Sequence, residues 1–373
     1  EQNPLPQRDI ALALAQAKAA AEAADEPADA TGADPRPVSL ADYADEFIDQ
    51  PDEERIDIFQ RKLAEIVEVT SFLGDHSDET FVYQVSVKGS GPEKGGKKSK
   101  KEAGIKVTFA ALPLEAGRIL GHKLKGVKKT IVITSATLST GGDFAYFKNR
   151  FDLEPETPSM TLDSPFDYAK NTVLYLPAHM PDVTKGDYPR AFMDETVKLL
   201  NLSKGRALVL FTSIARLKEV SRELQDKIPW PVMVQYEDTK ANLLDRFKNN
   251  VNSVLLATSS FWQGIDVPGE SLSVVIIDRL PFEPPSLPLF KGRERLLRER
   301  GLSPFYAYSL PQMLLTLRQG LGRLLRSSTD RGVLAIFDNR AASARYAKTI
   351  QKSLPPSHQA KKLSDLEGFL SSL

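Results

Sequence analysis

The chain has 373 residues, enough for two or three domains, and 41% of them are hydrophobic and 26% charged, as in ordinary globular proteins. Lysine plus arginine and aspartate plus glutamate each number 49, a balance that still permits a locally basic nucleic-acid groove. The absence of cysteine excludes disulfides, thiolate metal sites and cysteine-ligated iron–sulfur clusters within these residues, and it fits a cytoplasmic protein. No apolar run is long enough to cross a membrane, and no signal-peptide pattern is present.

The first hundred residues are expected to lie outside the main fold. Residues 1–37, rich in Ala, Asp and Pro, predict a flexible linker. Residues 38–73 show helical periodicity, and the alternation over 80–87 and 105–112 predicts two strands. Between these strands, residues 88–104 hold six lysines and several glycines, which predicts a solvated loop.

From about residue 105 onward, continuous apolar runs alternate with amphipathic stretches. The runs, typical of strands buried on both faces of a parallel sheet, are Thr130–Thr134, Ala207–Phe211, Val254–Ala257, Ser273–Ile277 and Val333–Phe337. The stretches with helical periodicity cover 189–202, 213–227, 240–249, 291–300 and 305–326. This alternation predicts an open α/β sheet, in which ligands bind at the carboxyl ends of the strands.

Polar residues follow every one of these apolar runs. They are Ser135 and Thr137 after the first, Thr212 and Ser213 after the second, Ser259, Ser260, Gly264 and Asp266 after the third, Asp278 and Arg279 after the fourth, and Asp338 and Arg340 after the fifth. A Ser or Thr that caps a helix next to free backbone N–H groups is suited to bind phosphate. Phe261 and Trp262 are more often core aromatics than base-stacking groups.

The run from Gln319 to Arg326, QGLGRLLR, carries the strongest signal for an anion site. On a continuous helix, Gln319, Arg323 and Arg326 would share one face, and Leu317, Leu321 and Leu324 would lie on the opposite face. Such a helix would bury one side and present two fork-shaped cations to a phosphate.

These motifs together resemble superfamily-2 helicases of the DinG/XPD type, in their C-terminal half. The resemblance covers about residues 105–373, through ITSATLS (133–139), LVLFTS (208–213), ATSSFWQGIDVPGESLSVVIIDRLPF (257–282) and QGLGRLLRSSTDRGVLAIFDNR (319–340). It implies a RecA-like open parallel sheet with helices on both faces over 160–373. It also implies the last part of a first RecA-like domain over 105–140, and the remnant of an arch-like insertion over 38–104.

The resemblance also implies roles for individual residues. Gln319, Arg323 and Arg326 would act on the γ-phosphate of ATP, one arginine serving as the arginine finger. Gly264, Asp266 and Gly322 would lie at the nucleotide, and Gly322 would allow its helix to approach a neighbour closely. Ser135 and Thr137 would link the nucleotide state to the DNA groove. The backbone of single-stranded DNA would be contacted by Thr212, Ser213, Ser259 and Ser260.

A phosphate loop and a carboxylate pair of the Walker B type are not found in the chain. The nearest match, residues 91–98, ends in Lys98 where a Ser or Thr should bind Mg²⁺. We therefore expect ATP and Mg²⁺ to be bound mainly by an N-terminal helicase domain, this chain's expected partner, and the isolated chain not to hydrolyse ATP. Whether an iron–sulfur cluster or an exonuclease domain lies upstream is left open.

As a whole, the resemblance implies a monomeric motor that moves 5′→3′ on single-stranded DNA in repair or replication. One alternative is a non-catalytic nucleic-acid-binding module that has kept the helicase fold. A metabolic α/β enzyme is disfavoured, because no acid–base constellation accompanies the arginines.

Overall fold

The computed structural model describes residues 64, 67, 69–89, 105–127, 130–135, 137–140, 142–162, 164, 166–258, 261, 267, 269–322, 324–325 and 330–372. The chain divides into two compact units. The first comprises Glu1–Glu115 with Ser286–Arg293, and the second Ala116–Pro285 with Glu294–Leu373. The domain boundaries expected from the sequence stay predictions.

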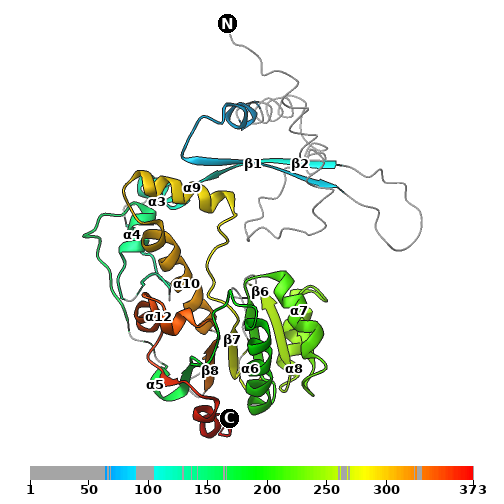
Figure 1. Ribbon diagram of the computed structural model, residues 1–373. Coiled ribbons are helices and arrows are strands. Elements are labelled where there is room, and N and C mark those ends of the chain that lie inside the picture. Colours follow the sequence, from blue (N-terminus) through cyan, green and yellow to red (C-terminus); the bar gives the residue numbers. More distant parts are fainter. Residues whose placement is uncertain are drawn as a thin grey trace, which may run out of the picture. The chain divides into compact units, whose positions relative to one another are not determined.

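In the first unit, two strands form an antiparallel hairpin. β1 (Phe81–Gly89) pairs with β2 (Ile105–Pro113) along its whole length, so both strands expected from the alternating pattern are confirmed (Figure 1). Residues 69–75 are helical, and Phe72 in this turn packs on Phe81 and Tyr83, with ring centroids 5.1 and 5.8 Å apart. The expected loop over 88–104, except Lys88 and Gly89 in β1, lies outside the described residues.

The second unit is built on a parallel sheet of seven strands in the order β5-β6-β4-β7-β8-β3-β9. The strands are β3 (Thr172–Tyr175), β4 (Ala207–Phe211), β5 (Val232–Val234), β6 (Val254–Thr258), β7 (Val274–Ile277), β8 (Gly332–Ile336) and β9 (His358–Ala360). Four of the five apolar runs are thus confirmed as buried strands, and they are the four neighbours β6-β4-β7-β8.

Helices cover both faces of this sheet, as the predicted RecA-like class requires: residues of α6 (Tyr188–Ser203), α7 (Ile214–Leu224) and α13 (Glu367–Leu370) pack on one face, and residues of α8 (Lys240–Asn249), α10 (Leu310–Leu321), α11 (Arg340–Ser343) and α12 (Ala347–Ser353) on the other. The other described helices are α3 (Ala116–Val127), α4 (Ala145–Phe151), α5 (Tyr168–Asn171), α9 (Pro288–Glu299), the π-helix η3 (Phe305–Ser309) and the 3-10 turn η4 (Leu363–Leu366). None of the described helices has the length and apolarity to span a bilayer.

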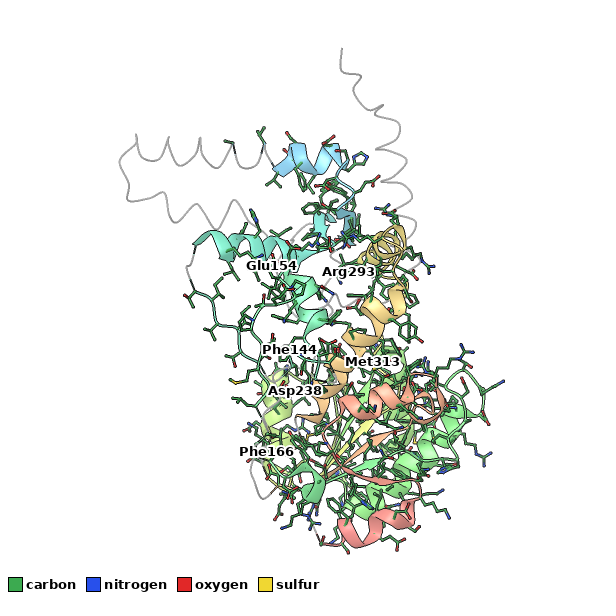
Figure 2. The ribbon with its side chains drawn as sticks, turned by 90° about the vertical axis from the view of Figure 1, so that its left-hand side faces the viewer. Phe144, Glu154, Phe166, Asp238, Arg293 and Met313 are labelled. Carbon is green, nitrogen blue, oxygen red and sulfur yellow. The ribbon has the colours of Figure 1, made fainter. Side chains whose placement is uncertain are left out.

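Alternate side chains of each central strand enter two separate cores. On β4, Leu208 and Leu210 join one core with residues of α8, α10 and α12, and Val209 and Phe211 join another with residues of α6 and α7. Because the central strands β4, β6, β7 and β8 bury both faces, their apolar runs are continuous and not alternating. Met313, labelled in Figure 2, and Leu317 are fully buried residues by which α10 enters the first core.

The expected strand at Thr130–Thr134 is wrong. None of these residues is in a strand, and Val132 is 84% exposed. A strand needs a neighbour whose backbone completes its hydrogen bonds, and none of the described strands pairs with this segment. The apolar pattern is present, but this segment takes no part in the sheet.

The continuous helix expected over 305–326 is also wrong. The helical stretch begins with η3, and α10 ends at Leu321, where the N–H of Gly322 donates to the carbonyl oxygen of Arg318 at 2.9 Å. Glycine has the lowest helix propensity after proline, so a glycine at this point favours the end of the helix. Arg323 and Arg326 lie outside the described residues, so the face that they would share with Gln319 stays a prediction.

Helix α4 is held close to α3 by two glycines one turn apart. A Cβ atom at Gly117 would lie 2.3 Å from the carbonyl oxygen of Arg150, and one at Gly121 would lie 2.1 Å from that of Phe151. Any side chain larger than hydrogen would separate the two backbones. The position of Arg150 is thereby fixed against α3.

Candidate functional site

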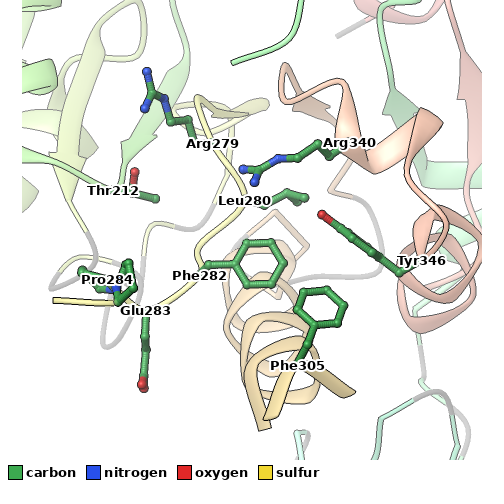
Figure 3. A pocket seen from close by; sticks show the side chains of 10 residues that line it. Thr212, Arg279, Leu280, Phe282, Glu283, Pro284, Phe305, Arg340 and Tyr346 are labelled. Carbon is green, nitrogen blue, oxygen red and sulfur yellow. The ribbon is translucent and has the colours of Figure 1, made fainter. Parts of the chain in front are cut away.

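The carboxyl ends of β4, β7 and β8 surround a pocket of about 400 Å³, drawn in Figure 3. Its lining residues are Thr212, Arg279, Leu280, Phe282, Glu283, Pro284, Pro285, Phe305, Arg340 and Tyr346. Thr212 follows β4, Arg279 and Leu280 follow β7, and Arg340 follows β8. The pocket therefore lies where an open parallel sheet ordinarily binds its ligand.

Asp338 connects two of these strand ends and holds one of the pocket's cations. Its buried carboxylate accepts from the N–H of Leu280 at 2.9 Å and from the N–H of Arg340 at 3.1 Å. The same carboxylate accepts two bonds from the Arg340 guanidinium, from Nε at 2.9 Å and from Nη2 at 2.6 Å. This bidentate hydrogen bonding raises the pKa of Arg340 and fixes the plane of its guanidinium group.

Three aromatic rings form the wall beside Arg340. Phe282 and Phe305 are 5.9 Å apart between centroids, Phe282 and Tyr346 are 6.2 Å apart, and Phe305 and Tyr346 are 5.1 Å apart. The guanidinium of Arg340 lies 5.6 Å from the centroid of the Phe282 ring. The rings come from the β7 end, from η3 and from the residue before α12, so only the folded chain brings them together.

Asp278, next to the pocket, is a buried carboxylate whose charge is poorly compensated. The Tyr188 hydroxyl donates to the Asp278 carbonyl oxygen and lies 3.2 Å from its Oδ1. Arg216 and Arg279 approach the carboxylate only to 3.8 Å, beyond hydrogen-bond distance. Burial therefore raises the pKa of Asp278 to about 6, although both arginines lower it.

This arrangement is suited to a ligand that combines an anion with a flat ring. Arg340 and Arg279 supply cations, and arginine binds phosphate or carboxylate oxygens through its planar fork. Aromatic faces stack on flat apolar rings. No group of three His, Asp or Glu side chains in the described part of the chain is placed to hold a metal ion.

Two of the residues selected from the sequence meet at this pocket. Thr212 lines it, and Ser213 is the N-cap of α7, where its Oγ accepts from the N–H of Arg216 at 3.5 Å. Both side chains are exposed. The N-terminal end of α7, with its free N–H groups, therefore begins directly beside the pocket.

Ser135 and Thr137 lie on a segment that α10 contacts near its carboxyl end. Ser135 Oγ is 3.4 Å from Thr137 Oγ1 and accepts from the N–H of Thr137 at 3.3 Å. Two residues on, the carbonyl oxygen of Ser139 accepts from Arg318 Nη1 at 2.6 Å. Arg318 thus ties this segment to the helix that carries Gln319.

The remaining selected residues have mixed outcomes. Gln319 is half-buried on α10. A Cβ atom at Gly322 would meet, among the described atoms, the carbonyl oxygens of Arg318 and Gln319 at ordinary distances of 3.5 and 3.8 Å, and the expected close approach to a neighbour stays a prediction. Outside the described residues lie Ser259, Ser260, Gly264, Asp266, Arg323 and Arg326.

The sequence alone gave no role to most of the pocket. Arg279, Phe282 and Arg340 were visible as residues after strands, but Phe305 and Tyr346 follow no strand and had no signal. Phe261 is buried in the core, as expected for an aromatic after β6. The sequence does not show that these three rings are close together, because the aromatic wall joins segments that are far apart in the chain.

Comparison with known proteins gives this geometry a family. The model for the helicase C-terminal domain matches residues 196–357. The ATP-dependent DNA helicase YoaA of Haemophilus influenzae is 37% identical over 270 residues, covering 72% of this chain and 41% of the relative. The ATP-dependent helicase DinG of Mycobacterium tuberculosis is 37% identical over 261 residues, covering 69% and 39%.

Among solved structures, one named XPD_Helicase is 18% identical, with a TM-score of 0.49, covering 68% of this chain and 46% of that chain. The chain spans about two fifths of the length of the curated relatives it matches. The family model and the relatives show that residues 196–357 match a helicase C-terminal domain and that the chain is similar to part of the DinG and YoaA helicases.

Proposed function

We propose that this chain is the C-terminal motor part of an ATP-dependent DNA helicase, and that the pocket at the ends of β4, β7 and β8 binds single-stranded DNA. The observation that carries the DNA-binding part is Arg340, fixed by Asp338 beside three aromatic rings. The relatives named as ATP-dependent helicases support the wider assignment.

In this proposal the pocket binds one phosphate and one base of the strand. Arg340 and Arg279 contact phosphate oxygens, and Thr212, Ser213 and the first N–H groups of α7 bind the neighbouring phosphate. A base stacks on the rings of Phe282, Phe305 and Tyr346. Because every base has an aromatic face, such binding tolerates any sequence, which suits a motor that moves along DNA.

The ATP-dependent part of the proposal rests on the motifs and on the relatives. Gln319, Arg323 and Arg326 would reach the γ-phosphate of ATP held with Mg²⁺ by a second helicase domain, and charge placed there speeds phosphoryl transfer. Gly264, Asp266 and Gly322 would border the nucleotide, and Ser135, Thr137, Ser259 and Ser260 would link it to the DNA. Movement 5′→3′, a role in repair or replication and a monomeric state belong to the same proposal.

Fluorescence anisotropy with a labelled oligothymidylate tests the pocket. Arg340→Gln removes a cation and should lower the salt dependence of binding by about one phosphate contact. Phe282→Leu keeps the apolar volume but removes a stacking face, and should weaken binding by about 5- to 150-fold. The matched control is Arg222→Ala, an exposed arginine in the last turn of α7, at the end of the helix away from Ser213. Equal affinities for all three variants and the unaltered chain would contradict the proposal.

ATP hydrolysis tests the other half of the proposal. The purified chain alone should show no DNA-stimulated turnover, because the proposed γ-phosphate residues need a nucleotide-binding partner domain. Turnover by the pure chain that is abolished by Arg326→Ala would show that the chain binds and hydrolyses ATP by itself, which this proposal does not allow.

A further inference from the structure

The pocket contains one acidic side chain among its lining residues, Glu283. A carboxylate that shares a pocket with two arginines can pair with them, and it then competes with any phosphate for the same cations. Its direction therefore determines how well the pocket binds an anion.

Glu283 is turned away from both cations. Figure 3 shows its side chain pointing away from Arg279 and Arg340. The hydroxyl of Tyr308 donates to Glu283 Oε2 at 2.7 Å, and Tyr308 itself is 7% exposed. A buried hydroxyl thus holds a half-exposed carboxylate in one direction.

Tyr308 is in turn held by a cation from α4. The Arg150 guanidinium lies 5.7 Å from the ring centroids of both Tyr308 and Tyr146, and Nη1 donates to the Tyr146 hydroxyl at 3.0 Å and to Gln312 Oε1 at 3.2 Å. Burial lowers the pKa of Arg150, but Tyr146, Tyr308 and Glu283 outweigh burial, so the pKa lies above its ordinary value.

The backbone around Tyr308 also favours this direction. Tyr308 lies in the π-helix η3, a wider turn that often occurs at functional sites, and α10 continues it directly. In the same turn Phe305 lines the pocket, whereas Tyr306 is 60% exposed. One short element therefore supplies both a ring of the wall and the hydroxyl that orients Glu283.

We propose that Tyr308, supported by Arg150, is a positioning residue that keeps the Glu283 carboxylate away from Arg279 and Arg340, so that these cations stay available to a DNA phosphate. This inference rests on the proposed DNA binding at the same pocket. Arg150 belongs to the segment that follows Ser135 and Thr137. A movement of this segment would therefore move the support of Tyr308 and, through it, the direction of the Glu283 carboxylate in the pocket.

The test uses the full 373-residue chain and a labelled oligothymidylate at low salt. Tyr308→Phe removes the hydroxyl and keeps the ring, so it should weaken binding by about 3- to 10-fold as Glu283 turns to the arginines. Glu283→Gln should stay within about twofold of the unaltered chain, since its charge is already directed away. The double variant should bind like Glu283→Gln. Tyr306→Phe, the neighbouring exposed tyrosine, is the matched control and should change nothing.

Three results would overturn the inference. The first is a Tyr308→Phe chain that binds normally. The second is a Tyr308→Phe defect that persists when Glu283→Gln is added, since the hydroxyl would then act only on the fold. The third is a Glu283→Gln chain that binds more than about fivefold tighter, since the carboxylate would then already oppose phosphate. This third result does not require Tyr308→Phe to fold.

The outcome is separable from that of the proposed function. If the unaltered chain binds DNA and Arg340→Gln weakens it, the pocket is a DNA site whatever Tyr308→Phe does. If Arg340→Gln and Phe282→Leu both bind normally, the DNA site is elsewhere and both proposals fail together.

Discussion

Replacing Asp338 with asparagine should destabilise the protein by about 2–4 kcal/mol. Asp338 is 1% exposed and accepts from the N–H of Leu280 and from two nitrogens of Arg340. A buried N–H left without a partner costs about 1–3 kcal/mol, and breaking a fully buried ion pair costs about 3–5 kcal/mol. The second figure is an upper limit here, because the Arg340 side chain is 35% exposed and regains water.

Asparagine also presents an NH₂ group to at least one of these donors, which is why a near-isosteric change is expected to be costly. The assay is urea unfolding followed by circular dichroism, compared with Asp365→Asn. Asp365 accepts from the N–H groups of Lys361 and Lys362 at the surface, and an asparagine oxygen can accept the same bonds. If both variants lost equally little stability, the role given to Asp338 in joining β7 to β8 would be refuted.

Three further predictions concern the pH dependence, packing and exposure of other positions. Burial raises the pKa of Asp278 from 3.8 to about 6, so the folded state keeps this proton to higher pH than the unfolded state does. The free energy of unfolding should therefore decrease as the pH rises from about 4 to about 6. Asp278→Asn should abolish this decrease, as measured by urea unfolding at a series of pH values. Gly332→Ala places a Cβ 2.5 Å from Leu324 Cδ1 and should lower the free energy of unfolding by about 1–3 kcal/mol. In the same assay Gly126→Ala in α3, whose Cβ meets nothing within 4 Å, should raise it by about 0.5–1 kcal/mol. Val132→Ser should change stability by no more than about 0.5 kcal/mol, because the side chain is 84% exposed; a loss typical of a buried strand would restore the rejected strand at Thr130–Thr134.

Four of the five strands that pair on both sides could be predicted from the sequence because each has several consecutive buried apolar residues, whereas β3, also buried throughout, was not predicted. β4, β6, β7 and β8 pair on both sides, so each must be apolar throughout. β5 and β9, at the two edges of the sheet, have three residues each, too few for a period to be recognised. The run at Thr130–Thr134 looks identical to a central strand, because composition reports apolarity and not the presence of a neighbouring strand.

The candidate site could be predicted only where it follows a strand. Thr212 and Ser213 were selected because a strand end followed by a helix start is visible in the sequence, and they do lie beside the pocket. The aromatic wall could not be selected, since the proximity of Phe305 to Tyr346 is a product of folding. The hydroxyl of Tyr308 was invisible for the same reason, because its partner Glu283 lies 25 positions earlier.

The strand order has a consequence for how this protein is made. β3 pairs with β8 in the register Thr172↔Gly332, so one of the first strands of the sheet finds its partner only after roughly 160 more residues have left the ribosome. Parallel pairings of such long range close slowly. The pocket needs the ends of β4, β7 and β8 together, so it forms among the last features of the second unit, and until then the apolar faces of the early strands are exposed to chaperones and to aggregation.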